Sequence, residues 1–530
     1  MIVSLILIFL AAVLCSALIF RRASNSEPID RTIAAAMPTL SAILGIDAFL
    51  NILYAPTWEW NDIRLARTFA IYKGGNLYPG QNVMGAIIGT DHTPMSHFLF
   101  WPATFSATPA LAICIGSTIA FGLVIAPLLW LFCIDKPREL LYSSYALIAC
   151  LYVLLRGGEY VGMQYCVFWV HTDAAAICFA TIAGGLLFRA RSNAGWRNLL
   201  LSAVFAVLSL ACKQTLAPVL LAFCLFVLIA DGLRVFYRYL ASLLVSGTVV
   251  VSFLVFRFWP LKDFLFNVVT MATHRPIKSQ LMQGILRTST DTAMESLPAI
   301  FCLLAFFLYW YFYERSFTKS WRDLFSNQRW LIFPLAGILL APVCIKARMT
   351  VGGSRNQIAL FCYFLALGAT LGLKGFMNEE ASSTRATASK FLATALIAMS
   401  FSGLVEALYD KLSLPPFSSK SNVTMAYEYA LKHPGKGYFP YYPLAGYYAQ
   451  HHFYDVDGAL QDREVTGYQV SQAQLAAGIP SEFTVVAYSK DQVPSKAMQE
   501  YIAGWPQVRD PELPGWTVFE RPPVVPRTPQ

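Results

Sequence analysis

The chain has 530 residues, of which 56% are hydrophobic and only 13% are charged, and its mean hydropathy is +0.51. Soluble domains carry about 25% charged residues, so this composition excludes an ordinary soluble protein and predicts an integral membrane protein. The formal net charge of +9 requires no nucleic-acid partner, because basic cytoplasmic loops produce such an excess. The eleven cysteines contain no CxxC pair, and they predict neither a disulfide framework nor a zinc site.

Apolar runs of the length that crosses a membrane recur along the chain. A hydrocarbon core of about 30 Å requires about 20 apolar residues. We expect an all-α polytopic membrane protein, with spans near residues 2–20, 34–53, 107–134, 139–156, 164–188, 198–212, 214–230, 238–256, 296–313, 329–345, 356–376 and 390–409.

The basic residues predict the orientation of these spans. The first span has no basic segment before it and is followed by Arg21 and Arg22, which argues against a cleaved signal peptide. Basic residues after a first span tend to stay in the cytoplasm, so the N-terminus and the loop 54–105 are expected outside. Lys and Arg are also denser in the loops that this assigns to the cytoplasm, such as 374–390.

The loop 54–105 is the most informative polar segment. Loops of this length are functional or disordered, and its many Trp, Tyr and Phe residues favour an ordered segment at the membrane interface. The stretch DIRLARTFAIYKGG predicts a short amphipathic helix along the membrane surface, opened by Asp62. An acidic residue in this position is a candidate general base, and Glu59 is a weaker one. Capping of the helix by Asn61 or Asp62 fits equally well.

Two further pairs of ionisable residues border the expected spans. Asp91 and His92 follow a Gly-rich turn, and Pro94 after them suits the first turn of a helix. They are candidate site residues or ordinary polar residues of a turn. His171 and Asp173, in HTDAAA, lie at the outer end of a span. Ionisable residues at this depth face a cavity or a partner, although a histidine at the water boundary is the alternative.

Basic residues near the outer ends of later spans could hold an anion. Lys213 interrupts a long uncharged stretch, so it must snorkel to the interface or meet an anion such as a lipid phosphate. Arg348 and Arg355 flank a Gly pair in KARMTVGGSRNQ, whose backbone N–H groups can approach an anion closely. His274 and Arg275 give the long outer loop a basic character, and ordinary solvated charge explains them equally well.

Composition changes after the last expected span. Alternating apolar and polar residues predict strands within residues 483–489 and 516–522, and helical patterns occupy 471–478 and 495–504. The chain is therefore expected to divide into a transmembrane domain and a small extracytoplasmic α+β domain, residues 1–409 and 410–530.

Several of these motifs together resemble the GT-C superfamily of glycosyltransferases, the polytopic enzymes that use polyprenyl-phosphate sugars. The resemblance is to the protein O-mannosyltransferase and aminoarabinose lipid A transferase type, and it covers roughly residues 30–376. It is carried by the acid-opened helix, the turn NLYPG, the Pro-led segment HTPMSHFLFWPA, the HTDAAA stretch and the lone CKQ. The chain departs from the pattern by an extra N-terminal span, and by WND in place of Asp-Glu. That departure leaves open whether Glu59 or Asp62 is the base.

The resemblance implies an inverting hexosyl- or pentosyltransferase in the bacterial cytoplasmic (inner) membrane. Its donor would be a polyprenyl-phosphate sugar, and its acceptor an extracytoplasmic glycan, lipid or protein. By motif, Asp62 corresponds to the general base, Asp91 loosely to a second acidic position, and Lys213 to a contact with the donor phosphate. The sugar, the acceptor, the lipid length and any divalent-cation requirement are left open.

Two other classes of protein share parts of this pattern. A secondary transporter predicts internal repeats and ionisable residues at the membrane midplane, whereas this chain shows no repeat and its charges gather at the outer boundary. An O-antigen polymerase or ligase would also use basic outer loops, but it relies less on an acid in the first loop. We therefore expect a membrane glycosyltransferase.

Overall fold

The computed structural model describes residues 2–23, 27–89, 92–132, 139–155, 162–190, 195–258, 260–277, 281–314, 320–353, 356–379, 383–413, 421–490 and 492–522. Its longer helices are α1 (Ile2–Arg22), α2 (Pro28–Leu53), α5 (Pro109–Phe132), α6 (Leu140–Leu155), α8 (Thr172–Arg189), α9 (Trp196–Cys212), α10 (Ala217–Asp231), α11 (Leu233–Arg257), α13 (Leu281–Tyr309), α15 (Ile332–Met349), α16 (Asn356–Met377) and α17 (Thr384–Ser413). Short helical segments between them are Ala55–Thr57, Trp101–Phe105, Gln214–Leu216, Trp310–Glu314, α14 (Trp321–Asn327) and Arg329–Leu331.

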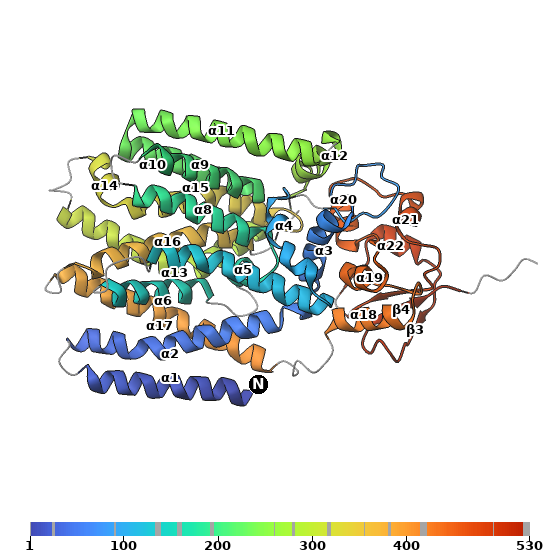
Figure 1. Cartoon of the computed structure of the whole chain (residues 1–530), viewed down its shortest axis with the longest axis horizontal. Helices are drawn as coiled ribbons and strands as arrows, with labels where there is room; N and C mark the ends of the chain where they lie inside the picture. Colours follow the sequence, from blue (N-terminus) through green and yellow to red (C-terminus); the bar gives the residue numbers. More distant parts are fainter. Residues whose placement is uncertain are drawn as a thin grey trace, which may run out of the picture.

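These helices run side by side as one bundle (Figure 1). Within the described ranges, nine helices are long and apolar enough to cross a membrane, and three shorter apolar helices accompany them, at Leu140–Leu155, Trp196–Cys212 and Ser296–Phe312. Each of the expected spans has its counterpart among them. The protein is therefore a multi-pass membrane protein with an all-α core.

Burial separates the centre of the bundle from its rim. In the most apolar stretch of α16, 89% of the residues are buried, whereas in α1 only 6% are. Helix α16 packs against α6, α13, α15 and α17, while α1 lies at one edge beside α2 (Figure 1). A helix that is apolar all round is stable at such an edge because lipid, rather than water, covers its outer face.

One expected span is broken. Residues 164–188 were predicted as a single helix, but they form α7 (Gly162–Phe168) and α8, with an extended residue between them. His171 has φ −141° and ψ 154°, and its side chain accepts a hydrogen bond from the backbone N–H of Asp173. The break therefore places a polar residue at the start of α8, where the free backbone N–H groups of a helix need acceptors.

The expected outer segment between the spans 238–256 and 296–313 is largely helical. It contains α12 (Leu261–Leu265), a π-helical turn at Phe266–Met271, and the first half of α13. The early part of α13 is polar, with the sequence RTSTDTAME. Hydropathy alone did not reveal a helix that continues beyond its apolar segment.

The first loop forms α3 (Glu59–Lys73) and α4 (Met95–Leu99), which lie between the bundle and the C-terminal region (Figure 1). Ten residues of α3 are buried, so the expected amphipathic helix is covered by protein on both of its faces. The helix already begins at Glu59, and neither Asn61 nor Asp62 is its N-cap. Pro94 immediately precedes α4.

Residues 421–522 form a small α+β unit, called the C-terminal unit below. Its sheet has the order β1-β2-β4-β3, in which β1 and β2 are parallel and the other pairs antiparallel. The strands are β1 (Gly437–Tyr438), β2 (Val485–Tyr488), β3 (Gln507–Val508) and β4 (Thr517–Glu520), and the helices are α18 (Asn422–Lys432), α19 (Pro443–Gln450), α20 (Asp457–Val465), α21 (Gln472–Gly478) and α22 (Lys496–Tyr501). The two predicted strands and two predicted helices are confirmed as β2, β4, α21 and α22.

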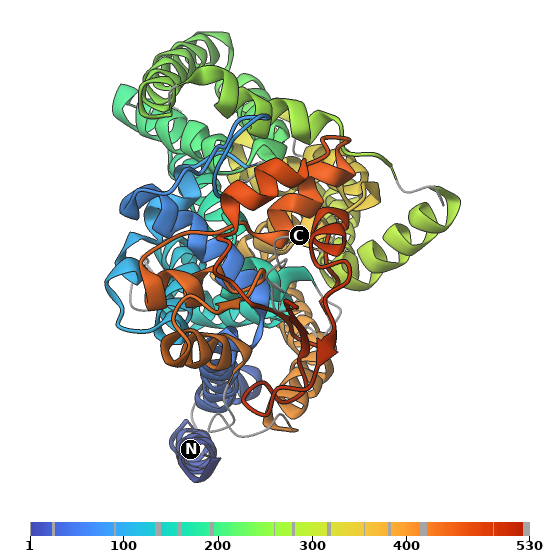
Figure 2. The same cartoon turned by 90° about the vertical axis from the view of Figure 1, so that its right-hand side faces the viewer.

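The C-terminal unit covers the end of the bundle where α3 lies (Figures 1 and 2). The C-terminal unit contacts the first loop through backbone and side-chain hydrogen bonds. The Ile87 N–H donates to Asp455 Oδ1 at 2.7 Å, and the Val456 N–H donates to the Ile87 carbonyl at 3.0 Å. Arg463 donates to the carbonyls of Pro79 and Gly80 at 2.8 and 2.9 Å. The loop is therefore held between two folded layers.

Candidate functional site

Helix α3 presents different side chains to its two neighbours. With 3.6 residues per turn, Arg64 and Arg67 fall on one face and Asp62 on the opposite one. The two arginines line a cavity toward the bundle. Asp62 faces the C-terminal unit, where its Oδ1 accepts a hydrogen bond from the Leu444 N–H at 2.9 Å. Phe69, two turns after Asp62, packs its ring against the tyrosines of α19.

The cavity is basic. Its lining comes from α3, α4 and the segment that leads into α8, and consists of Arg64, Arg67, His92, His97, Phe100, Val170, His171 and Thr172. No carboxylate belongs to this lining in the part of the chain that the structure describes. Burial, followed by the charge of Arg67, lowers the pKa of Arg64 to about 9, so Arg64 is still a cation at neutral pH. Such a recess concentrates positive potential and favours an anion.

His97 is the least satisfied residue of this cavity. Its side chain is 3% exposed, and neither ring nitrogen has a hydrogen-bond partner among the described residues. Burial, followed by the positive charge of Arg67, holds the pKa of His97 well below its ordinary value, so the ring is neutral at pH 7. A neutral imidazole offers one donor and one acceptor, and leaving such buried groups unsatisfied costs about 1–3 kcal/mol.

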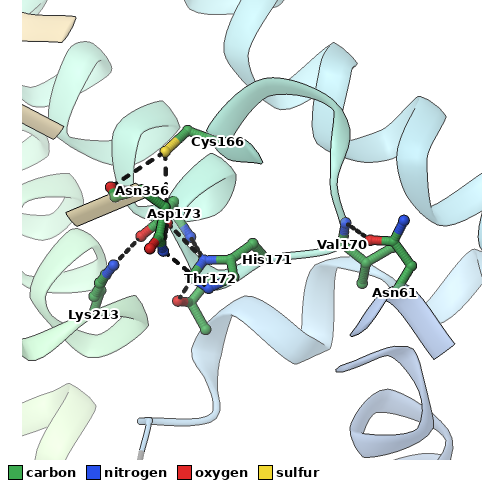
Figure 3. Close-up of polar contacts among 8 residues, drawn as sticks. All are labelled: Asn61, Cys166, Val170, His171, Thr172, Asp173, Lys213 and Asn356. Atoms are coloured by element: carbon green, nitrogen blue, oxygen red, sulfur yellow. Dashed lines mark hydrogen bonds and ion pairs between the residues drawn. The ribbon is translucent and has the colours of Figure 1, made fainter. Parts of the chain in front are cut away.

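A second polar cluster lies next to the cavity and shares His171 with it (Figure 3). Its centre is the buried carboxylate of Asp173, which contacts His171 Nδ1 at 2.7 Å and forms an ion pair with Lys213. Asn356 Nδ2 donates to Asp173 Oδ2 at 3.1 Å, and the Cys166 thiol lies 3.6 Å from the same oxygen. Four separate segments of the chain therefore converge on one carboxylate.

Lys213 meets an anion within the protein. It lies between α9 and the short helix that leads into α10, with an extended backbone and 1% exposure. It therefore does not snorkel to the interface, and its ammonium group forms an ion pair with the Asp173 carboxylate. Because a buried charge requires compensation, the structure explains Lys213 and Asp173 as mutual partners. His171, at 6% exposure, is likewise not a histidine at the water boundary.

Of the expected anion site around the Gly pair, the structure describes Arg348 but not Arg355. Arg348, in the last turn of α15, donates from Nη1 to the Gly353 carbonyl at 3.0 Å. His274 is exposed, and its Nδ1 lies 2.7 Å from the Thr270 carbonyl. Arg275 forms an ion pair with Asp462 of the C-terminal unit at 2.6 Å. None of these three side chains belongs to the lining of the basic cavity.

The remaining predicted residues divide into two groups. His92 lines the cavity, and Glu59 is partly buried in the first turn of α3. Asp91 and Arg355 lie outside the described residues. Among the residues that are described, no group of three His, Cys, Asp or Glu side chains is placed to hold a metal ion.

Three ionisable residues of the cavity were not predicted as site residues: Arg64, Arg67 and His97. The sequence does contain a signal for the two arginines: they are three positions apart, and positions i and i+3 of a helix share a face. The sequence reasoning followed the acidic residue that opens the stretch and not the basic face of the helix. No local pattern marks His97, since its setting depends on α3 and on the segment before α8.

Comparison with known proteins gives a similarity at the level of structure. No protein-family model and no curated protein matches the chain. Among solved structures, the chain is similar to the oligosaccharyltransferase of Archaeoglobus fulgidus in its apo form, with 12% identity, a TM-score of 0.41, and coverage of 85% of this chain and 70% of that one. By its name, that protein is an oligosaccharyltransferase.

Proposed function

We propose that the protein is a membrane glycosyltransferase that moves a sugar from a polyprenyl-phosphate donor to an extracytoplasmic acceptor. The observation that carries the proposal is the buried cavity lined by two arginines and three histidines. The motif resemblance to GT-C glycosyltransferases supplies the class of reaction. The cavity supplies the complementary charge; its volume of about 10 Å³ is roughly that of one water, so binding of a phosphate there requires the lining side chains to move apart.

The charge of this cavity suits the leaving group of such a reaction. A sugar linked through a phosphodiester carries one negative charge, and the phosphate gains charge as its bond to the sugar breaks. Fixed cations stabilise this developing charge more strongly than the ground state. Arginine is suited to the task because its planar group donates two parallel hydrogen bonds to phosphate oxygens. Arg64 and Arg67 are therefore the proposed phosphate ligands.

Asp62 is the proposed general base, with Glu59 as the second candidate. Burial raises the pKa of Asp62 well above its ordinary value, which favours proton uptake by the carboxylate. Its Oδ2 has no hydrogen-bond partner among the described residues. Because Asp62 faces α19, across α3 from the cavity, this role requires α3 to move so that the carboxylate and the donor phosphate come to the same side.

The proposal is tested by incubating the purified protein with a panel of radiolabelled polyprenyl-phosphate sugars. Release of free lipid phosphate from one member of the panel supports the proposal and identifies the donor. A panel in which every donor stays intact, with acceptors present and the protein folded, would reject the proposed reaction. Uptake of an intact substrate into proteoliposomes without cleavage would instead indicate a transporter.

A further inference from the structure

His97 has a setting that its own helix does not explain. Its backbone carbonyl accepts a hydrogen bond from Thr68 Oγ1 at 3.2 Å, which fixes α4 against α3. The imidazole then points into the basic cavity with both nitrogens unpartnered among the described residues. A buried ring with an unmet donor and an unmet acceptor is a group that a ligand can satisfy.

The charged and titratable groups facing His97 come from three elements. Arg64 and Arg67 come from α3, His92 from the segment before α4, and His171 from the segment before α8. All of them are cationic or become so on protonation, and the described part of the lining has no carboxylate. Burial and these neighbours together disfavour a charged His97. A phosphate group beside the ring reverses the sign of the local field, because an opposite charge within about 4–6 Å favours the protonated form.

We propose that His97 takes up a proton when a phosphate group enters the cavity, and that the resulting imidazolium is the third cation holding that phosphate. The inference rests on the proposed function, since it assumes that the cavity receives the donor phosphate. His97 then has a binding role. Both the affinity of the cavity for the phosphate and the uptake of a proton depend on its side chain.

The test uses isothermal titration calorimetry of the full-length protein in detergent. The probe is farnesyl methyl phosphate, a phosphodiester that remains a monoanion throughout the pH range used, whereas a phosphomonoester would itself titrate near pH 6. Titrations in buffers of different ionisation enthalpy count the protons taken up. We expect an uptake approaching one proton at about pH 7, and an affinity that rises as the pH is lowered, with a limit of about tenfold per pH unit for one linked proton. Farnesol serves as the uncharged control.

Two variants locate the proton. His97→Gln retains a donor and an acceptor but cannot titrate, so it should remove the uptake and flatten the dependence of affinity on pH. His274→Gln is the matched control, because His274 is exposed and lies outside the cavity lining, and it should behave as the wild type does. Wild-type uptake that persists in a folded His97→Gln protein would overturn the assignment to His97.

The wild-type protein alone can also overturn the inference. Binding of the phosphodiester without proton uptake would contradict the role of His97 and leave the phosphate site standing. Failure of the folded protein to bind the phosphodiester more tightly than farnesol would instead reject the phosphate site, and with it the basis of both proposals. The two failures are therefore distinguishable even if His97→Gln does not fold.

Discussion

At the scale of single residues, Asp62 is the position where two physical roles compete. Its Oδ1 accepts from the N–H of Leu444, near the start of α19, where a carboxylate satisfies a free helical N–H and interacts favourably with the helix dipole. Its Oδ2 has no hydrogen-bond partner among the described residues. One oxygen therefore serves docking of the C-terminal unit, and the other is available for proton transfer.

Asp62→Asn separates these roles. Asparagine retains an oxygen that can accept from Leu444, but it cannot take up the acceptor's proton. We expect turnover to fall by about 10²–10⁴-fold, with a melting temperature close to that of the wild type and donor binding unchanged. The measurement is release of lipid phosphate together with thermal unfolding. Full turnover in Asp62→Asn, combined with loss of activity in Glu59→Gln, would make Glu59 the base.

Lys213→Ala tests whether the buried ion pair is structural. Removing the ammonium group leaves Asp173 without its charge partner, and breaking a buried pair in this way typically costs about 3–5 kcal/mol. We expect a clear fall in melting temperature, largely recovered in the double variant Lys213→Met with Asp173→Asn, which removes both charges. Unchanged stability in Lys213→Ala, with weaker binding of a polyprenyl phosphate, would instead support the direct phosphate contact expected from the sequence.

The sequence could predict which of these residues were unusual, but not how they pair. His171, Asp173 and Lys213 stood out because each lies beside apolar sequence. The ion pair between Asp173 and Lys213 joins residues 40 positions apart, on segments whose contact depends on helix packing. For the same reason, sequence alone did not show that Asp62 and Arg64 would face different partners.

At the scale of elements, the C-terminal unit holds the first loop through Asp455. This carboxylate accepts the Ile87 N–H at 2.7 Å, and burial raises its pKa to about 7. The folded state therefore binds a proton at Asp455 more tightly than the unfolded state does. The resulting stabilisation is fully present below about pH 4, and it is lost as the pH rises through about 7.

Asp455→Asn should reduce this pH dependence. Between about pH 5 and 8 we expect the wild-type protein to lose about 1–4 kcal/mol of stability through this group, and the variant to lose less. Burial also raises the pKa of Asp457 to about 6, so a part of the slope should remain. Thermal unfolding across this pH range is the measurement, with the exposed Glu482→Gln as control. An identical slope in Asp455→Asn and wild type would show that Asp455 does not titrate with folding.

Sequence periodicity predicted many elements correctly. It failed where a helix and its apolar segment do not begin or end at the same residue. The alternating patterns of β2 and β4 and the apolar spans are local properties, and the structure confirms them. The polar first half of α13 and the break before α8 were missed. In both places the helix boundary and the hydropathy boundary differ, because backbone hydrogen bonding continues through polar residues and stops within apolar ones.

At the scale of the whole molecule, the C-terminal unit and the first loop lie at the same end of the bundle (Figures 1 and 2). The reaction proposed here requires this end to face outward. The Lys- and Arg-dense loops predict the opposite end to be cytoplasmic. The proposed reaction and the distribution of basic residues therefore predict the same orientation of the protein in the membrane, by independent arguments.

Cysteine labelling tests this orientation in a background without the native cysteines. Ala473→Cys lies on exposed α21 of the C-terminal unit, and Thr384→Cys is exposed at the start of α17. We expect a membrane-impermeant thiol reagent to modify the first in intact spheroplasts, and the second only after lysis. The reverse pattern would invert the topology and place the proposed acceptor site in the cytoplasm.

The most direct measurement compares lipid-phosphate release by the wild type and by the double variant Arg64→Gln with Arg67→Gln. Loss of two charge-assisted contacts, each worth about 1.5–3 kcal/mol, should lower release of polyprenyl phosphate by at least about 100-fold. The control is Arg234→Gln with Arg238→Gln, which removes the same charge from exposed positions of α11 and should leave turnover unchanged. If the cavity variant folds and releases lipid phosphate as fast as the wild type, the cavity does not hold the donor phosphate.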